Sequence, residues 1–253
     1  MILCGENLTF SYGRAPVLDD VSLSFGHGEL VMLVGPNGSG KSTLLKLLSG
    51  FLRPARGKVL LNGAPLAEYS WRERTRRQAF LSQESFPALE FTVRESVMLG
   101  RNPHLGVFSA PGREDEAAID AALETMELTA LADRPMNRLS GGERQRTMLA
   151  AVLAQQSECL LLDEPTSALD VRHTLKLVEH LRELRRRCGI LMVTHDLGLA
   201  LRYADRVVLL KEGAVVASGP PDETMNERNL SFAYRCHAAV LRDARFKTVV
   251  FYR

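Results

Sequence analysis

The 253-residue chain has only four cysteines, and none of them is spaced for metal binding or cross-linking. Cys4, Cys159, Cys188 and Cys236 are scattered, without a C-x-x-C pair. Zinc sites and disulfide frameworks use regular cysteine spacings, so the sequence indicates neither. Cys159 begins an apolar run and is predicted to be a small buried side chain. This usage fits a reducing compartment, and we expect a cytoplasmic setting.

Long apolar runs are also missing. No uninterrupted apolar stretch approaches the roughly 20 residues that a helix needs to cross a bilayer. Residues 1–6 lack the basic stretch and apolar core of a signal peptide. We therefore expect any membrane association to depend on a partner protein.

No charge of one sign dominates, because 32 Lys and Arg residues face 30 Asp and Glu residues, for a net charge of +2. Nucleic-acid-binding surfaces usually concentrate more positive charge, so we expect no nucleic-acid partner. The basic runs at 72–77 and 185–187 are interpreted as solvated faces, the second at a helix C-terminus, where cations are favourable. The length suits one large α/β domain with an inserted subdomain.

What the chain does contain is a phosphate-binding loop. Residues 35–43 read GPNGSGKST and fit the pattern G-x-x-x-x-G-K-[ST]. An apolar run at 30–34 precedes the loop and a helix-like stretch follows it, which is the context that the motif requires. Backbone N–H groups at the helix N-terminus can cradle phosphates, Lys41 can bind the β- and γ-phosphates, and Ser42 can ligate Mg²⁺. The sequence therefore predicts a nucleoside triphosphate site.

The distribution of apolar runs predicts the architecture. Residues 1–30 contain short strands, and a further strand pair turns at residues 62–63. From about 86 to 155 the strand-like runs vanish and helical periodicity takes over, which predicts an inserted helical subdomain. Alternation of buried strands and helices then resumes, with strands at 160–164 and 190–193. We expect an α/β fold with a mainly parallel core sheet, an N-terminal antiparallel β subdomain and the inserted helical subdomain.

Three polar side chains follow these buried strands. Asp163 and Glu164 end the first strand, at the edge where α/β sheets bind ligands. Adjacent carboxylates are costly there unless they serve a metal or a proton, the alternative being a solvated strand end. His195 follows the second strand in the same way. A lone histidine is more often structural, but its place beside the predicted phosphate site indicates a γ-phosphate contact.

A second phosphate-seeking feature lies at 139–146, LSGGERQR. Ser140 and Glu143 form a capping box, which by itself would be only structural. The glycines between them, Gly141 and Gly142, leave bare N–H groups that can meet an anion. This segment resembles the signature sequence of the ATP-binding-cassette (ABC) ATPases. In that family the signature of one protomer contacts the γ-phosphate of the ATP held by the other.

The resemblance covers residues 12 to 195, with each family motif present once and in order, and continues to about 220. It implies that Asp163 holds Mg²⁺ through water, that Glu164 polarises the attacking water, and that His195 is the switch histidine. Gln83 is implied to reach Mg²⁺ and the attacking water, although its sequence context alone indicates only a surface glutamine. Many family members carry glutamine where this chain has Glu143, and the added charge could weaken contact with the partner's nucleotide.

Two further segments match the family. Tyr12 resembles the aromatic residue that stacks on adenine, the alternative being a turn tyrosine that packs on Pro16. Residues 167–170 resemble the D-loop, which crosses the dimer interface. ATP and Mg²⁺ are therefore the expected cofactors. The implied catalytic residues are Lys41, Gln83, Glu164 and His195; the nucleotide-binding residues are Tyr12, Gly35, Pro36, Asn37, Gly38, Ser39, Gly40, Lys41, Ser42, Thr43, Ser140, Gly141, Gly142 and Asp170; the metal ligands are Ser42, Gln83 and Asp163.

The implied organisation is an ABC ATPase domain over residues 1–220, with the helical insertion at about 86–155, and a tail at 221–253 to which we assign no role. The family works as homodimers that sandwich two ATP molecules, with Ser140 and Gly142 of one chain completing the site of the other. A single cassette without a membrane span is typical of a separate transporter subunit. We expect it to lie peripherally on the cytoplasmic face of the cell membrane, bound to a permease dimer.

The transported substrate is indicated only by Gly100-Arg101-Asn102-Pro103-His104. This segment resembles the Gly-Arg-x-Pro-His segment of cassettes that serve ferric-siderophore, haem and cobalamin importers. It implies import of a metal chelate, a permease docked near Gln83 and residues 91–104, and indirectly a substrate-binding protein. One alternative is that Pro103 and His104 merely end a helix. Another is that the chain is a non-transport ABC ATPase, such as an iron–sulfur cluster assembly ATPase.

Overall fold

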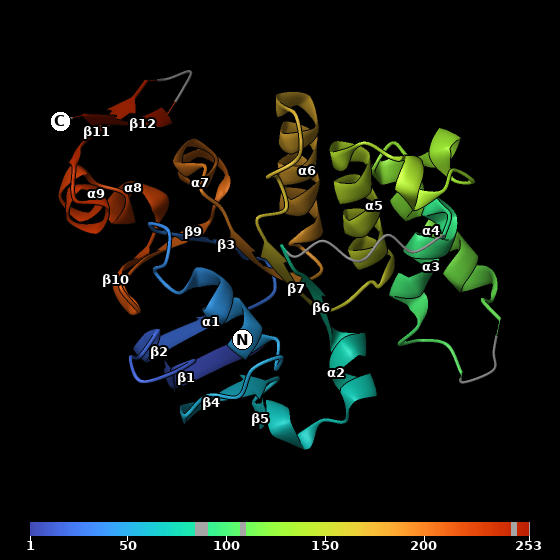
Figure 1. Ribbon diagram of the computed structural model, residues 1–253, viewed down its shortest axis with the longest axis horizontal. Helices are drawn as coiled ribbons and strands as arrows, with labels where there is room; N and C mark the ends of the chain where they lie inside the picture. Colours follow the sequence, from blue (N-terminus) through green and yellow to red (C-terminus); the bar gives the residue numbers. More distant parts are fainter. Residues whose placement is uncertain (84–90, 107–109, 244–246, 253) are drawn as a thin grey trace.

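The largest sheet of the computed structural model, which describes residues 1–83, 91–106, 110–243 and 247–252, is mainly parallel. Its strands are β3 (Leu30–Val34), β6 (Gln78–Leu81), β7 (Cys159–Asp163), β8 (Gly189–Val193), β9 (Arg206–Lys211) and β10 (Ala214–Gly219). They lie in the order β10-β9-β3-β8-β7-β6, and all neighbours are parallel except β10 with β9. This confirms the predicted core sheet (Figure 1).

Strand β3 shows why this sheet needs continuous apolar runs. Its five residues are all buried. Leu30, Met32 and Val34 belong to one hydrophobic cluster, whereas Val31 and Leu33 belong to another. Successive side chains of a strand point to opposite faces, so both faces of the sheet are covered.

The N-terminal part forms a separate antiparallel sheet, as predicted. Its strands are β1 (Leu3–Phe10), β2 (Leu18–Phe25), β4 (Arg56–Leu61) and β5 (Ala64–Pro65), in the order β2-β1-β4-β5. Helix α1 (Lys41–Leu48) lies between the two sheets, because its leucines share one hydrophobic cluster with β1, β2 and β3. Burial on both sides fixes the position of α1, and with it the loop that precedes it.

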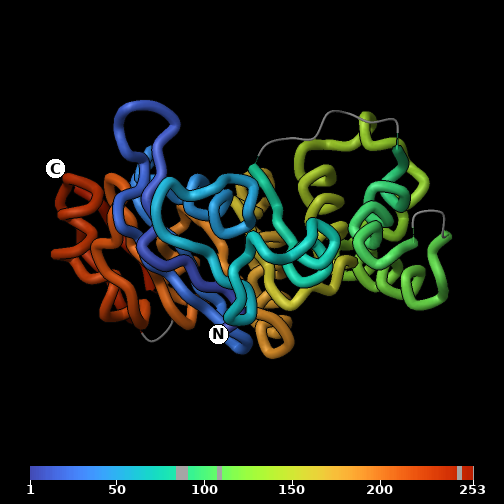
Figure 2. Tube along the Cα trace, turned by 90° about the horizontal axis from the view of Figure 1, so that it is seen from below, coloured from blue at the N-terminus to red at the C-terminus, as the bar shows by residue number. Residues whose placement is uncertain are grey.

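The helices divide into two groups. Figures 1 and 2 both place α3, α4 and α5 together at one end of the molecule, away from β1 and β2. This is the predicted helical subdomain; its predicted start at residue 86 lies outside the described residues. Where the structure describes the chain, it holds no helix with the length and apolarity to span a membrane. The helices are α2 (Trp71–Arg77), α3 (Val93–Met98), α4 (Arg113–Thr125), α5 (Gly141–Ala154), α6 (Val171–Leu184), α7 (Leu197–Tyr203), α8 (Pro221–Thr224) and α9 (Glu227–Tyr234), with short 3-10 turns η1 (Leu66–Glu68), η2 (Leu99–Arg101), η3 (Thr129–Leu131) and η4 (Met136–Arg138).

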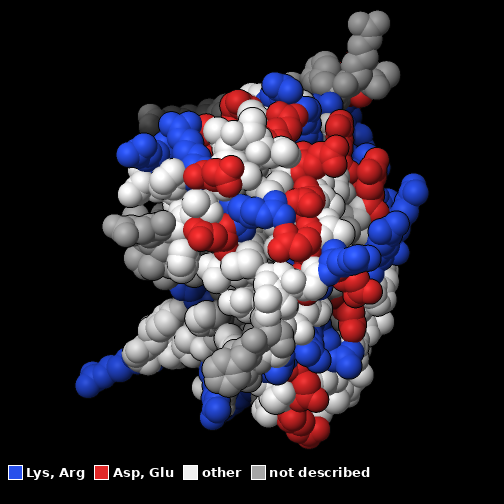
Figure 3. Space-filling model, turned by 90° about the vertical axis from the view of Figure 1, so that its right-hand side faces the viewer, with Lys and Arg blue, Asp and Glu red and all other residues white. Residues whose placement is uncertain are grey.

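The end face of the helical subdomain carries basic and acidic side chains intermixed (Figure 3). Arg94 of α3, for example, pairs with both Glu116 and Asp120 of α4. Such exposed pairs contribute little each, so packing rather than charge holds these helices together.

The basic run at 72–77 is more than the solvated face that the sequence predicted. It forms α2, opened by a capping box between Ser70 and Glu73. Arg72 and Arg76 then donate to the backbone carbonyl of Pro103, at 3.2 and 2.7 Å. Two cations of the run therefore hold a loop of the helical subdomain.

The tail, to which the sequence assigned no role, folds into α8, α9 and a hairpin of β11 (His237–Arg242) and β12 (Lys247–Tyr252). Asp222 of α8 accepts from Lys247 at 2.7 Å and from Arg242 at 3.1 Å. The hydrogen bond from Lys247 is the main cause of a lowered pKa of Asp222, and the bond from Arg242 acts in the same direction. Strand β12 lies against α7. The tail is thus packed on the end of the cassette opposite the helical subdomain (Figure 1).

Candidate active site

The phosphate-binding loop joins the end of β3 to α1. Gly35 and Gly40 have φ values of 151° and 101°, which favour glycine. A Cβ on Gly35 would also clash with the carbonyl oxygen of Leu210 on neighbouring β9. Gly40 occupies the N-cap of α1 and supplies no side-chain cap. The first N–H groups of α1 are therefore available to an anion.

Two polar side chains in the loop are buried in a way that fits a bound phosphate. Lys41 is 5% exposed, and its ammonium donates to the carbonyls of Gly35 (2.8 Å) and Pro36 (2.9 Å). Burial lowers the pKa of Lys41, while the carboxylates of Glu164 and Asp163 oppose this shift. The hydroxyl of Ser39 is buried and has no hydrogen-bond partner within the described part of the chain. Buried hydroxyls are normally bonded, and a phosphate oxygen would supply the missing acceptor.

Ser42 and Asp163 are in direct contact. The Ser42 hydroxyl donates to Oδ1 of Asp163 at 3.1 Å. Asp163 ends β7 and is 1% exposed. Burial raises the pKa of Asp163, and the hydrogen bond from Ser42 acts against this rise. A hydroxyl and a carboxylate together are suitable ligands for Mg²⁺, whose positive charge would compensate the buried carboxylate. The residues present therefore fit this ion.

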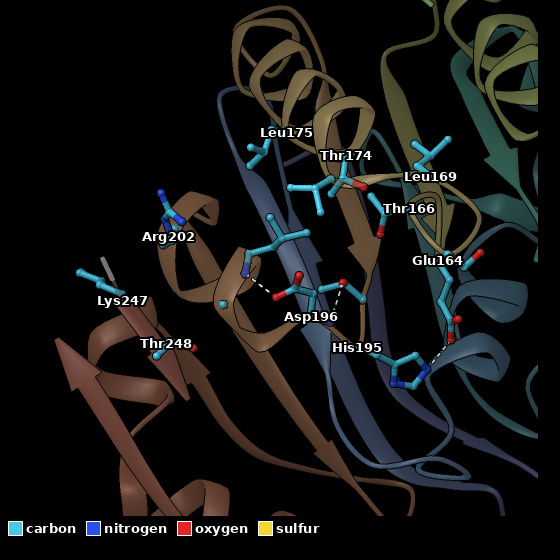
Figure 4. Close-up of a pocket in the computed structure, with 15 residues that line it drawn as sticks. Glu164, Thr166, Leu169, Thr174, Leu175, His195, Asp196, Arg202, Lys247 and Thr248 are labelled. Carbon is cyan, nitrogen blue, oxygen red and sulfur yellow. Dashed lines mark hydrogen bonds and ion pairs between the residues drawn. The ribbon is translucent and has the colours of Figure 1, made fainter. Parts of the chain in front are cut away.

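Glu164, Gln83 and His195 converge at the same edge of the sheet. Oε1 of Glu164 lies 2.5 Å from Nε2 of His195, and Oε2 accepts from Nε2 of Gln83 at 3.0 Å. Figure 4 shows the His195 ring pointing at the Glu164 carboxylate. Because β6, β7 and β8 are parallel neighbours, the residues that follow them meet at their carboxyl ends. The structure therefore brings together Glu164 and Gln83, which the sequence proposed around an attacking water, and His195, which it proposed as a γ-phosphate contact.

The backbone of Glu164 is itself unusual. Its φ of 49° lies in the left-handed region, which costs a non-glycine residue about 1–3 kcal/mol. Its N–H donates to Val193 at 3.2 Å, and its carbonyl accepts from Ser167 at 3.2 Å. These bonds to β8 and to the D-loop hold the conformation that aims the carboxylate at Gln83 and His195.

A cavity of about 650 Å³ opens beside Glu164 and His195 (Figure 4). Its walls come from the D-loop, α6 and α7, and from Lys247 and Thr248 of β12. Neither of these two tail residues was assigned a role from the sequence, and no local pattern marks them. Only the packing of the tail on α7 brings them to the D-loop.

The signature residues lie apart from the loop of their own chain. Ser140 caps α5 by accepting from the N–H of Glu143 at 3.3 Å, and Glu143 accepts from the N–H of Ser140 at 2.7 Å. The hydrogen bond from the backbone N–H of Ser140 is the main cause of a lowered pKa of Glu143. A Cβ on Gly142 would lie 3.1 Å from the carbonyl oxygen of Ala168, so the signature faces its own D-loop. Figures 1 and 2 place α5 across β7 and α6 from α1.

Two other proposed nucleotide contacts have local partners. Tyr12 is 64% exposed, and its ring packs edge-on against Phe10 at 4.9 Å between centroids. Asp170 caps α6 by accepting from the backbone N–H of His173 at 2.8 Å, and also lies 2.9 Å from its Nδ1. These contacts leave the exposed Tyr12 ring accessible and fix the end of the D-loop.

We expect Asp163→Asn to raise the thermal stability of the ligand-free chain at pH 7. A carboxyl group whose pKa is raised by folding destabilises the fold once the pH exceeds its unfolded pKa, and stability is lost as pH rises through the folded pKa. The amide removes this cost and can still accept from Ser42. The gain should be a few degrees in Tm at pH 7 and should vanish below about pH 4.

Thermal unfolding from about pH 3 to pH 8 without nucleotide measures this effect. Asp133→Asn, at an exposed position, is the matched control and should leave the Tm unchanged at each pH. A lower Tm for Asp163→Asn at pH 7 would show that the Asp163 charge stabilises the empty site instead.

The fold and this site define a P-loop ATPase cassette. The family model described as ABC transporter matches residues 18–167. The chain is 40% identical to the ferric enterobactin transport ATP-binding protein FepC of Escherichia coli K12, over 95% of this chain and 90% of the relative. It is 46% identical to the hemin import ATP-binding protein HmuV of Streptomyces coelicolor, over 92% and 83%. The chain belongs to the ABC transporter family, as an ATP-binding subunit that hydrolyses ATP.

Solved structures agree with this assignment. A metal-chelate type ABC transporter in an inward-facing conformation matches 100% of this chain and 98% of its own, with a TM-score of 0.84 and 27% identity. An ATP-binding cassette in a dimeric post-hydrolysis state, bound to ADP and phosphate, matches 87% and 99%, with a TM-score of 0.76 and 28% identity. The first match extends over the tail as well as the cassette.

Proposed function

We propose that this ATPase drives the import of a metal chelate, of the ferric-siderophore, haem or cobalamin type, through a separate membrane permease. The observation that carries the proposal is similarity over nearly the whole chain to the ATP-binding proteins of ferric enterobactin and hemin import systems. The similarity to a metal-chelate type transporter, tail included, supports the same substrate class. The non-transport alternative has no comparable support.

Within one chain, the proposed chemistry divides among the residues described above. The N–H groups of the loop and the Lys41 ammonium bind the phosphates. Ser42 and Asp163 would hold Mg²⁺, which neutralises phosphate charge when bound. Glu164 accepts the proton of the attacking water, since its carboxylate is held in place by Gln83 and His195. In this proposal His195 also contacts the γ-phosphate.

A second copy of the chain is needed to complete each site. Ser140 is the N-cap of α5 and Gly142 lies in its first turn, where backbone N–H groups can bind an anion from another molecule. Helix α5 belongs to the group of helices that lies away from the sheet of β1 and β2 in Figure 1. We therefore infer a head-to-tail homodimer that holds two ATP molecules. A dimeric cassette among the structural neighbours supports this arrangement.

A groove of about 660 Å³ is the proposed docking site for the permease. It lies between α2 and residues 99–106, and Gln155 also lines it. Trp71 is 60% exposed and Leu99 41% exposed at its walls, and Phe51 packs near Trp71. An exposed apolar patch of this kind marks an interaction site, here for a cytoplasmic segment of the permease. The chain would then lie peripherally on the cytoplasmic face of the membrane, and reach a substrate-binding protein only through the permease.

Reconstitution with candidate permeases tests this function. We expect chelate-loaded binding proteins to stimulate ATP hydrolysis several-fold in proteoliposomes that contain the matching permease. Trp71→Glu should abolish the stimulation and leave hydrolysis by the isolated chain unchanged, because it places a charge in the groove. Stimulation only by a phosphate, sugar or amino-acid system would refute the chelate assignment and leave the ATPase assignment intact.

A further inference from the structure

The Gly-Arg-Asn-Pro-His segment has two faces, and only one of them lines the groove. Leu99, Asn102 and Pro103 lie in the groove wall. Gly100, Arg101 and His104 instead contact the last turn of α5, the helix that begins with the signature. The segment was predicted to lie at the partner-facing edge, and two of its five residues, Asn102 and Pro103, line the groove proposed for the permease. The other three residues face the end of α5.

The three inward residues contact carbonyls at the C-terminal end of α5, those of Ala151, Ala154 and the C-cap residue Gln155. Arg101 donates to the carbonyl of Ala154 at 2.8 Å, and His104 Nε2 lies 2.9 Å from the carbonyl oxygen of Gln155. A Cβ on Gly100 would clash with the carbonyl oxygen of Ala151, so only glycine lets the segment approach this closely. The last carbonyls of a helix have no partner within the helix, and cations near them are favourable. The motif thus caps the C-terminus of the signature helix.

Arg101 also fixes this cap within the helical subdomain. It is 6% exposed and pairs with Asp115 of α4 at 2.8 Å. Breaking the pair would leave a buried guanidinium without its partner, which costs free energy. The Arg101–Asp115 contact is therefore stable once it has formed. The same side chain therefore joins α4, the motif and the end of α5.

The opposite face of the segment is bonded to helix α2, outside the helical subdomain. Arg72 and Arg76 of α2 donate to the carbonyl of Pro103, and Arg72 also donates to the carbonyl of Leu105. Gln155, the residue after α5, donates to the carbonyl of Gln78 at 3.1 Å. Gln78 lies where α2 ends and β6 begins. The segment is accordingly a bridge, bonded on one side to α2 and on the other to α5.

We propose that Gly100, Arg101 and His104 are positioning residues that couple the groove to the signature. Helix α5 has 14 residues and so spans about 21 Å, with the motif at one end and Ser140 at the other. Movement of the groove wall displaces the last turn of α5. The rigid helix carries this displacement to Ser140, and so to the γ-phosphate of the ATP held by the second ATPase chain. Gly100, Arg101 and His104 contact the end of α5 and do not line the groove. The coupling role rests on the proposed function of the groove.

The position of α5 can be measured without permease or nucleotide. Nitroxide labels at Arg138→Cys and Glu179→Cys, both exposed, report the distance between the signature end and α6; Cys236→Ser removes the one native cysteine that is not buried. His104→Phe keeps a ring but loses the donor, whereas His104→Gln keeps a donor. We expect the width of the distance distribution to at least double in His104→Phe and to return to that of the parent in His104→Gln, with little change in Tm. An unchanged width in His104→Phe overturns the proposal.

Gly100→Ala provides a second variant, since its methyl group must push the segment off α5. It too should broaden the distribution, and a folded Gly100→Ala chain with the parent width would also count against the bridge. In proteoliposomes, His104→Phe should lose most of the stimulation by the permease while basal hydrolysis is retained. If no permease stimulates even the parent chain, the proposed function fails. The distance measurement still tests whether the segment positions α5, because it needs no permease.

Discussion

Glu164→Gln should keep ATP and lose about 10²–10⁴-fold in turnover, the usual contribution of a general base. The amide preserves the shape of the side chain beside Gln83 and His195 but cannot accept a proton from water. ATP affinity should be near that of the parent, because the phosphates are held by Lys41 and the N–H groups of the loop. Equilibrium binding and single-turnover hydrolysis, measured separately, distinguish the two effects.

Trapped ATP should also make the Glu164→Gln dimer persist, which light scattering with ATP and Mg²⁺ can detect. Glu179→Gln, on the exposed side of α6, is the matched control and should behave like the parent. Parental turnover by Glu164→Gln would remove this residue from the role of base. A strictly monomeric Glu164→Gln chain at saturating ATP would argue against the shared sites.

Lys41→Ala should weaken ATP binding by about 10- to 100-fold, because hydrogen bonds to charged groups contribute about 1.5–3 kcal/mol. The buried ammonium now bonds to the carbonyls of Gly35 and Pro36, so it is already positioned inside the loop before the nucleotide arrives. Titration with a fluorescent ATP analogue measures the loss. Lys58→Ala removes an exposed lysine of β4 and should leave the affinity unchanged; a comparable loss there would mean that bulk charge, not the loop, binds the nucleotide.

Mixing two inactive chains tests whether the sites are shared. A Lys41→Ala chain keeps its signature, and a Ser140→Arg chain keeps its loop. A mixed dimer then has one intact site, formed by the loop of the second and the signature of the first, and one doubly damaged site. Recovery of hydrolysis on mixing is the expected result, whereas no recovery would indicate that each chain acts on its own ATP.

The part of the site that could be predicted from sequence is the part built by neighbours in sequence. The strand, glycine turn and helix around Lys41 create a phosphate site locally, and Asp163 and Glu164 end a buried run that could only be a strand. Glu164 and His195 were predicted from their places after buried strands, whereas Gln83 followed from the family resemblance alone. The three converge because β6, β7 and β8 are adjacent, which no local pattern encodes. The roles of the proposed site residues in binding and catalysis, those of Tyr12 and Asp170 included, remain predictions.

What could not be predicted depends on contacts between distant segments. Helix α2 looked like a charged surface run, because nothing near Arg72 or Arg76 in sequence reveals that Pro103 lies beneath them. Arg101 and His104 likewise bind carbonyls about fifty residues away, on α5. The tail was assigned no role because its packing against α7, not its periodicity, brings Lys247 and Thr248 to the cavity beside Glu164.

The pairing of β3 has a consequence for biosynthesis. Leu30 lies opposite Ile190 of β8, and Met32 lies opposite Val207 of β9, so both neighbours of this early strand are made late. Until they leave the ribosome, β3 has unpaired edges and the loop after it has no fixed frame. A nascent chain that ends before β9 should therefore be unable to bind ATP, and its apolar strands would need protection from aggregation. Once β8 and β9 have paired with β3, ATP can bind, and its binding then stabilises the folded chain.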